Sequence, residues 1–536
     1  MKQHINHYIN IKNCSLLLCF IFSFSKINAQ QNSKPVAVTN YQNPIIHADY
    51  SDPDAIRVGN DYYMTASSFN NIPGLPILHS TDLVHWEIIN YAIKKLEPAI
   101  HYNKVQNGCG VWAPAIRYHN GEFYIYYPDP DFGIYLTKTK DIKGSWSEPV
   151  LVQKGKGLID PCPLWDDDGK CYLVHAYAGS RAGFKSILVV KEMNKEGTKI
   201  IGEGVMVYDG HQLDPTVEGP KFYKRNGYYY IFAPAGGVGT GWQIVLKSKN
   251  IYGPYERKIV MQQGKSTING PHQGAWVNTP DGKDWFLHFQ DKDAYGRIVH
   301  LQPMKWVNDF PVIGSDKGGV GEPVDNGIVN TKESKLSIAA TDEFNKAKLG
   351  LQWQWQANEQ EGWAFATPDG FLRIFSVLDS TNGNLYYLPN ILTQKLPAET
   401  FSATAKLIIN PKFGNEKFGL AILGNDYAHI AINKLDKAYK ITYAKCLDAD
   451  KNRLETEMKS DTISNNTVYL KLAVTKGAIC NFSYSIDGTS FTTLSDNFIA
   501  KPGRWVGAKM GFFFTRKQIT NDAGFVDIDW FRVTTN

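Results

Sequence analysis

Five short stretches of this chain, each a tight turn followed by an aromatic-rich segment, decide its fold. They read GNDYYMTASS at 59–68, NGEFYIYYPD at 120–129, DGKCYLVHAY at 168–177, NGYYYIFAPA at 226–235 and DGKDWFLHFQ at 281–290. Asn-Gly and Asp-Gly favour type I′ hairpin turns because both central residues need positive φ, and the flanking residues are β-formers. Their spacing of about 48 to 61 residues suits a four-stranded propeller blade. We therefore predict an all-β fold with a five-bladed β-propeller; a sandwich or meander with coincidental turns is the alternative.

The repeat also predicts where a functional site lies. Eight residues before the turn, four of the units carry Asp52, Trp112, Asp160 and Glu218, and nine residues before the fifth turn stands His272. The first strand of each blade lines the central channel, so equivalent positions on the blades converge at one mouth of the axis. We expect one pocket that holds three carboxylates, a tryptophan and a histidine.

Three carboxylates in one pocket suit glycoside hydrolysis. Like charges that lie close together keep one group protonated near neutral pH, which gives an acid and a base side by side. An inverting glycosidase uses such a pair, one carboxylate to activate water and one carboxylic acid to protonate the leaving oxygen. The third carboxylate would raise the pKa of the acid and orient it. Trp112 would stack on a sugar face, or pack in a blade core.

Two other classes of protein fit the same residues. A carbohydrate-binding propeller without catalysis would use the carboxylates only to bind sugar hydroxyls. A metal-dependent hydrolase could use three carboxylates and a histidine as calcium or manganese ligands. The chain has no dense Asp/Asn loop of the calcium-binding kind, and the run at 166–168 is expected to be a solvated hairpin turn.

The charge distribution argues against one class of binding partner, and the N-terminal sequence indicates the cellular compartment. The net charge of +5 is spread over 536 residues without a Lys/Arg block, so no nucleic-acid partner is expected. Residues 1–29 have the layout of a cleaved secretory signal peptide, and the apolar run at 14–24 is too short for the membrane anchor that is its alternative. We expect a secreted or periplasmic protein with no membrane span in the mature chain.

The chain resembles family 43 of the glycoside hydrolases, the β-xylosidase and α-L-arabinofuranosidase group. The motifs are NPIIHADYSDPDAIRVGNDYYMTASSFNNIPGLPILHSTDLVHW from residue 43, then GVWAPAIRY, LIDPCPLWDDDG, TVEGPKFY and GPHQGAWV, in the order of the family. The resemblance covers nearly the whole mature chain. It implies that Asp52 is the general base, Glu218 the general acid, and Asp160 the residue that tunes the pKa of the acid and orients it.

The resemblance also suggests residues that bind substrate. Arg297 would be a substrate-binding cation, Phe69 part of the hydrophobic wall of the terminal sugar site, and His272 a residue near the channel centre, with a structural calcium ion near it as a further expectation. Many members have HPDPS where this chain has SDPDA, so Asp54 adds a carboxylate beside Asp52. The spacing to the turn favours Asp52 as the base.

A second domain follows the propeller. We predict the propeller over 36–322, a Gly-rich linker over 323–341 and a β-sandwich over 342–536, with about ten strands of alternating pattern. The sandwich resembles the concanavalin-like domain of the β-xylosidase type. It could bind carbohydrate, support the propeller, or supply a loop that closes the active site. We favour the loop, with Phe512, Phe513 and Phe514 as candidates for it or for a buried strand.

Together these observations predict a secreted, inverting, exo-acting hydrolase that needs no cofactor. It would remove terminal β-D-xylose or α-L-arabinofuranose from plant cell-wall oligosaccharides or polysaccharides, with a slight preference in this prediction for xylose. The natural polysaccharide and the oligomeric state stay open.

Overall fold

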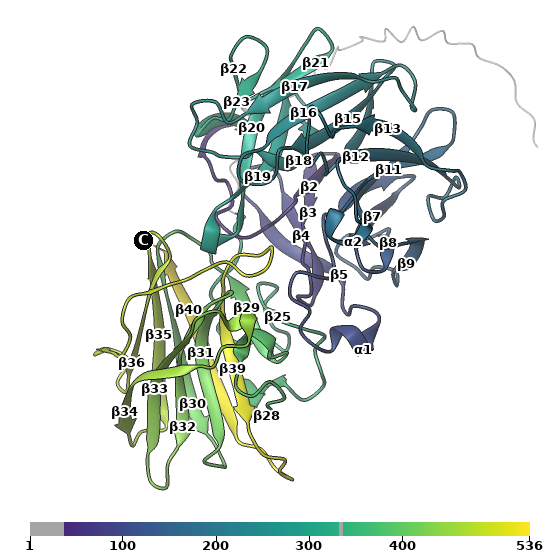
Figure 1. Ribbon diagram of the computed structural model, residues 1–536. Helices are drawn as coiled ribbons and strands as arrows, with labels where there is room; N and C mark the ends of the chain where they lie inside the picture. Colours follow the sequence, from purple (N-terminus) through teal and green to yellow (C-terminus); the bar gives the residue numbers. More distant parts are fainter. Residues whose placement is uncertain (1–36, 332–335, 536) are drawn as a thin grey trace, which may run out of the picture. The chain divides into compact units, whose positions relative to one another are not determined.

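The computed structural model describes residues 37–331 and 336–535, and the chain from Ala37 onward forms one compact unit. Strands make up nearly all of its regular structure (Figure 1). The predicted signal peptide, residues 1–29, lies outside the described residues. Among the residues that are described, no helix has the length and apolar character that a membrane crossing requires.

Five antiparallel sheets follow one another along the chain as the blades of the predicted propeller. In each blade the strands pair in sequence order, which is the meander expected from the repeat. The strands are β2 (Asp54–Val58), β3 (Asp61–Thr65), β4 (Gly74–Ser80) and β5 (Glu87–Ile93) in blade 1; β6 (Ala115–His119), β7 (Glu122–Asp129), β8 (Gly133–Thr139) and β9 (Val150–Lys154) in blade 2; β10 (Leu158–Trp165), β11 (Cys171–Tyr177), β12 (Ile187–Met193) and β13 (Val205–Asp209) in blade 3; β14 (Lys221–Arg225), β15 (Tyr228–Ala235), β16 (Trp242–Ser248) and β17 (Glu256–Gln262) in blade 4; and β18 (His272–Asn278), β19 (Asp284–Asp291), β20 (Arg297–Val307) and β21 (Phe310–Ile313) in blade 5.

The five repeated turns join the first strand of each blade to the second, as predicted, but their geometry differs. Both central residues have positive φ, the type I′ pattern, only at Asn120-Gly121 and Asn226-Gly227. In blade 1 only Gly59 of the two-residue loop does, which is the type II′ pattern. The loops of blades 3 and 5 are longer, because pairing ends at Trp165 with Cys171 and at Asn278 with Asp284.

The segments on either side of the propeller pair with each other. β1 (Ala37–Gln42) is antiparallel to β24 (Asn326–Thr331), so part of the predicted linker is a strand. The Asn43 side chain donates to the carbonyls of Leu301 and Val324, 2.9 and 2.8 Å away. β22 (Ser315–Asp316) and β23 (Gly321–Glu322) extend the sheet of blade 4.

Two eight-stranded sheets form the β-sandwich, rather than about ten strands in all, because several strands have only two to four residues. Alternating inward residues, such as those of β30, build its core. The first sheet contains β25 (Gln354–Trp355), β28 (Val377–Leu378), β29 (Ile391–Lys395), β31 (Glu416–Leu423), β32 (Tyr427–Lys434), β33 (Tyr439–Cys446), β34 (Thr456–Ile463) and β39 (Lys509–Arg516); the second contains β26 (Ala364–Ala366), β27 (Leu372–Phe375), β30 (Phe401–Asn410), β35 (Thr467–Thr475), β36 (Ile479–Ser485), β37 (Thr492–Thr493), β38 (Phe498–Ile499) and β40 (Phe525–Thr535).

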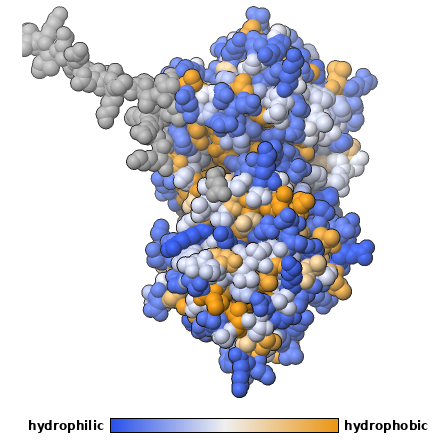
Figure 2. All heavy atoms as spheres, turned by 90° about the vertical axis from the view of Figure 1, so that its left-hand side faces the viewer, coloured by the Kyte–Doolittle hydropathy of each residue, from blue (hydrophilic) through white to orange (hydrophobic). Residues whose placement is uncertain are grey.

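Helical segments are short. They are α1 (Ala99–Tyr102), α2 (Gly179–Ala182) and the 3₁₀ turns η1 (Asp293–Tyr295), η2 (Leu385–Tyr387) and η3 (Ala449–Lys451). Hydrophilic side chains cover most of the face shown in Figure 2, and the hydrophobic ones on it lie in small separate groups.

Backbone and side-chain contacts join the propeller to the sandwich. Ile72 and Trp355 form an isolated β-bridge, and the Asn358 side chain accepts from Leu96 N at 2.8 Å and donates to Leu96 O at 2.9 Å. On the propeller side, these contacts involve the loop before β4 and the loop after β5, so blade 1 is the blade that they join to the sandwich.

Candidate active site

The first strands of the blades bring the predicted site residues into one pocket. Asp52, Trp112 and Glu218 stand just before β2, β6 and β14, Asp160 lies within β10, and His272 begins β18. The pocket has a volume of about 390 Å³, within the range of small-ligand sites. All seven predicted residues line it, together with residues that the sequence did not indicate; the full lining is Asp52, Phe69, Trp112, Ala113, Ile159, Asp160, Ala178, Gly179, Ser180, Lys185, Glu218, Val238, His272, Gln273, Arg297 and Trp505.

Irregular strand pairing sets the orientation of two of these side chains, Asp160 and His272. The pairing of β10 with β11 shifts between Ile159 and Cys162, so Asp160 lies in a bulge, and the pairing of β18 with β19 shifts in the same way just after His272. Bulges redirect side chains at the ends of strands. Asp160 and His272 therefore lie where strand pairing is irregular, close to the start of their strands.

Asp52 is held on several sides. It is buried, and its Oδ2 accepts hydrogen bonds from the hydroxyls of Ser51 and Ser67 at 2.6 and 2.5 Å. Arg297 Nη1 lies 3.3 Å from Asp52 Oδ1 and donates to Ser51 Oγ at 2.7 Å. The carboxylate therefore has a fixed orientation beside a cation.

Asp160 and Glu218 differ in exposure. Asp160 is buried and accepts from the backbone N–H of Gly219, the residue after Glu218, at 2.7 Å. Burial and then the neighbouring Glu218 charge raise the pKa of Asp160 to about 8. The Glu218 side chain is 27% exposed, so it can reach a bound molecule. The cluster therefore keeps a proton at neutral pH next to a carboxyl that faces the cavity.

His272 contacts Glu218. Its Nε2 lies 3.0 Å from Glu218 Oε1, and its Nδ1 is buried without a hydrogen-bond partner. Calcium prefers oxygen ligands, and the unpartnered buried atoms here, His272 Nδ1 and Gln273 Nε2, are nitrogens. Within 37–331 and 336–535, no three His, Cys, Asp or Glu side chains are grouped to hold a metal ion. A calcium ion near His272 stays a prediction.

Aromatic side chains form the walls of the pocket. The ring centroids of Phe69 and Trp112 are 6.5 Å apart, and those of Trp112 and Trp505 are 6.2 Å apart, both edge to face. Trp112 is partly exposed and its indole N–H donates to Gly108 O, so it is a wall residue and not only a core residue. Trp505 belongs to the loop before β39, so the sandwich does supply a pocket residue.

That loop residue does not come from 512–514; of the two alternatives predicted for these phenylalanines, the buried strand is the one that the structure shows. Phe512, Phe513 and Phe514 are fully buried in β39 and pack in the sandwich core clusters. Successive side chains of β39 point to opposite faces of its sheet, and a hydrophobic cluster covers each face. Phe512 and Phe514 pack in one cluster, and Phe513 packs in the other. The Pro-Gly turn at 502–503 was the one sequence signal near Trp505.

Asp54 is not part of the pocket. It is fully buried, forms an ion pair with Arg117 at 2.6 Å, and accepts from Ile116 N at 2.8 Å. It thus links blade 1 to blade 2. The preference for Asp52 over Asp54 agrees with this placement.

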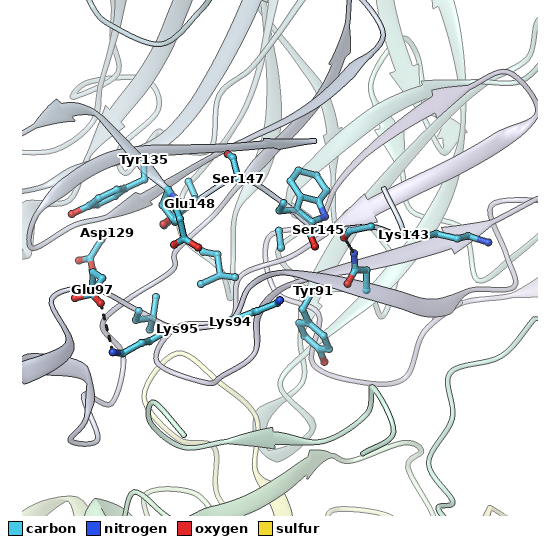
Figure 3. Close-up of a pocket in the computed structure, with 18 of the residues that line it drawn as sticks. Tyr91, Lys94, Lys95, Glu97, Asp129, Tyr135, Lys143, Ser145, Ser147 and Glu148 are labelled. Atoms are coloured by element: carbon cyan, nitrogen blue, oxygen red, sulfur yellow. Dashed lines mark hydrogen bonds and ion pairs between the residues drawn. The ribbon is translucent and has the colours of Figure 1, made fainter. Parts of the chain in front are cut away.

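A larger cavity of about 580 Å³ lies between blades 1 and 2, where β5 and the segment after it face β7, β8 and the loop before β9 (Figure 3). Lys95 and Glu97 form an ion pair across 3.8 Å there, and Asp129 is buried and accepts from the Tyr102 hydroxyl. None of the residues at the shared repeat position lines this cavity. The smaller pocket is therefore the candidate active site.

Comparison with known proteins agrees with the geometry. The family model described as glycosyl hydrolases family 43 matches residues 41–311, and that of the β-xylosidase C-terminal concanavalin A-like domain matches residues 341–534. The chain belongs to glycoside hydrolase family 43. Its second domain is accordingly a concanavalin-like sandwich.

Relatives within family 43 carry two kinds of name. The chain is 38% identical over 488 residues to a protein of Xylanibacter ruminicola with a provisional β-xylosidase name, covering 89% of this chain and 86% of that protein. It is 31% identical to a β-xylosidase of Formosa agariphila, covering 92% and 90%. It is 29% identical to a non-reducing end α-L-arabinofuranosidase of Bacteroides ovatus, covering 78% and 79%. The crystal structure of the GH43 protein BlXynB of Bacillus licheniformis aligns with a TM-score of 0.82 at 26% identity, covering 93% of this chain and all of that one.

Proposed function

We propose that this family 43 member is an inverting, exo-acting pentosidase. The observation that carries the proposal is the pocket itself, in which three carboxylates from three blades meet under aromatic walls. Asp52 would be the general base that activates water, and Glu218 the general acid that protonates the leaving oxygen. Asp160 would tune the general acid and orient it.

The pocket supports exo action on one terminal sugar. Its volume of about 390 Å³ suits a monosaccharide with part of the next residue, and Trp505 narrows it from the sandwich side. Phe69 and Trp112 offer apolar surface for a sugar ring, and Arg297 offers a cation for hydroxyl groups. Because relatives are named both xylosidases and arabinofuranosidases, we propose β-D-xylose or α-L-arabinofuranose from plant cell-wall glycans as the substrate, cut by a protein that is exported.

The test is hydrolysis of 4-nitrophenyl β-D-xylopyranoside and 4-nitrophenyl α-L-arabinofuranoside by wild type and Glu218→Ala, with and without chelator. We expect turnover of at least one glycoside by wild type, a loss of about 10²-fold or more in the variant, and no effect of chelator. Turnover of neither by wild type would contradict the pentosidase assignment, and loss with chelator would favour a metal-dependent hydrolase.

The stereochemistry has its own test. Proton NMR of the first sugar released from the β-xyloside, before mutarotation, should show α-xylose, since single displacement by water inverts the anomeric carbon. First release of β-xylose would point to a covalent intermediate and would remove the base role of Asp52.

A further inference from the structure

Two lysine side chains of the sandwich, near segments that carry pocket residues, are shielded from water. Lys395 of β29 and Lys509 of β39 are direct register partners; Lys509 is buried and Lys395 is half-buried. Burial lowers the pKa of Lys509 to about 7 and lowers that of Lys395 as well. The carboxylate whose charge acts on both is Asp49, which is itself buried.

Asp49 joins two segments that carry pocket residues. Its Oδ1 accepts from the backbone N–H of Arg297, and its Oδ2 accepts from that of Gly507, each at 2.9 Å. Gly507 follows Trp505 by two residues. The packing is tight, because a Cβ on Gly296 would lie 2.5 Å from the Asp49 Cγ. One buried carboxylate therefore links blade 5 to the loop that bears Trp505.

Lys509 makes a parallel contact with a third wall segment. Its ammonium group donates to Asn71 Oδ1. Asn71 closes the turn that begins at Ser68, since its backbone N–H and its side-chain amide both donate to Ser68 O at 3.0 and 2.9 Å. Phe69 lies inside this turn with φ of +51°, a conformation that needs support.

We propose that Asp49 and Lys509 are positioning residues for the active site: Asp49 holds Arg297 and the Trp505 loop, and Lys509 holds the turn that carries Phe69. The inference rests on the proposed glycosidase function and deepens it, since it explains why the sandwich is part of a working pocket. Neither residue lines the pocket or touches the substrate.

A role in stability alone explains Asp49 and Lys509 less well than a positioning role does. Burying a charge costs free energy, and apolar residues of similar volume pack such a site at least as well. An apolar side chain at position 49, however, leaves two backbone N–H donors without an acceptor. The two carboxylate oxygens of Asp49 thus match the task of fixing two chain segments at defined positions.

The experiment compares Asp49→Asn and Lys509→Met by hydrogen–deuterium exchange and by kinetics. In D49N, peptides covering Trp505 to Ala508 should exchange about 10-fold faster, with little change at Phe69 to Asn71; in K509M the pattern should reverse. For the pentoside that wild type hydrolyses, KM should rise about 10-fold in D49N while kcat changes less than about 3-fold, because the walls bind the sugar in ground and transition states alike.

Asp527→Asn is the matched control. Asp527 is a buried sandwich carboxylate that pairs with Arg373 of the same sheet at 2.7 Å. It should lower the unfolding temperature without changing KM or the exchange of either segment. Equal exchange in wild type, D49N and K509M, or faster exchange spread over the whole chain in both variants, would overturn the proposal.

The two proposals fail separately. Exchange needs no substrate, so an enzyme inactive on pentosides would contradict the proposed function while the exchange pattern still decides the positioning roles. K509M keeps the apolar stem of the lysine, and it decides the matter if D49N does not fold.

Discussion

Three of the seven predicted pocket residues have positive φ angles, which residues other than glycine rarely adopt, and Gln273 of the pocket lining has one as well. The φ angles of Asp52, Phe69 and Asp160 are +55°, +51° and +57°. Such residues cost on the order of 1–3 kcal/mol each and persist where the surroundings hold them. Here hydrogen bonds from Ser51 and Ser67 hold Asp52, and one from Gly219 holds Asp160. Asn71 closes the turn that contains Phe69. The strained conformations are therefore supported by their surroundings, and they orient the side chains towards one cavity.

The acid role of Glu218 can be tested by comparing Glu218→Gln on two substrates whose leaving groups differ in their need for a proton. Glutamine keeps the size of the side chain but has no carboxylic proton, so kcat on xylobiose or an arabinose-substituted oligosaccharide should fall about 10³-fold. The loss on the 4-nitrophenyl glycoside should be smaller, because that leaving group departs without protonation. Steady-state kinetics on both substrates measure the difference; the exposed Glu256→Gln is the control, and equal losses on both substrates would contradict the role.

Asp160 should make stability depend on pH. A carboxyl with a raised pKa holds its proton in the folded state while the unfolded chain releases it above about pH 4. Its contribution to the free energy of unfolding therefore falls as pH rises from about 4 towards the pKa of about 8, by at most about 1.4 kcal/mol per pH unit. Urea unfolding of Asp160→Asn at several pH values should show a shallower fall than wild type. Asp168→Asn, in an exposed turn, should keep the wild-type slope, and an unchanged slope in D160N would contradict the assignment.

At the scale of elements, the site depends on where regular structure ends. The first strands are regular over the blade cores, and the functional side chains lie at their entries, in bulges or just before pairing begins. The loop before β39 adds the one wall that does not come from a blade. It is held by backbone contacts such as Ala508 N to Ala294 O at 2.7 Å.

Trp505→Ala tests that loop. Removing the indole opens the pocket on the sandwich side, so KM for the 4-nitrophenyl pentoside should rise about 10-fold with a smaller change in kcat. Trp505→Phe should recover part of the loss. Trp530→Ala, on β40 of the sandwich, removes an indole that does not line the pocket and should leave KM unchanged. Equal KM in W505A and wild type would show that the loop does not contact the sugar.

For the whole molecule, the sandwich is expected to be a requirement for activity. A chain that ends at Thr331 lacks Trp505 and exposes residues such as Ile72, which is buried beside Trp355. We expect its kcat/KM to fall at least about 10-fold further than that of full-length W505A, with a lower unfolding temperature. Kinetics and thermal unfolding of the two proteins side by side measure this; equal kcat/KM would mean that the sandwich contributes only its tryptophan.

The repeat in the sequence was sufficient for the fold class and for five pocket residues, and the resemblance to family 43 added Phe69 and Arg297. A propeller is a local repeat whose strands pair in chain order, so a turn signal and a fixed offset from it place one residue per blade at the channel mouth. The type I′ pattern expected from the turn residues was wrong for three turns: the loops of blades 3 and 5 are longer than two residues, and the two-residue loop of blade 1 has the type II′ pattern.

Tertiary structure alone decided the remaining wall and its support. Trp505 reaches a pocket built from blades far earlier in the chain, Asp49 bonds to Gly507 across 458 residues, and Lys509 bonds to Asn71 across 438. No period or motif links such positions, since their proximity arises only when the sandwich packs on the propeller. For the same reason the sequence offered Phe512 to Phe514 in place of Trp505: hydrophobicity marks what is buried, and only packing determines which side chain reaches the cavity.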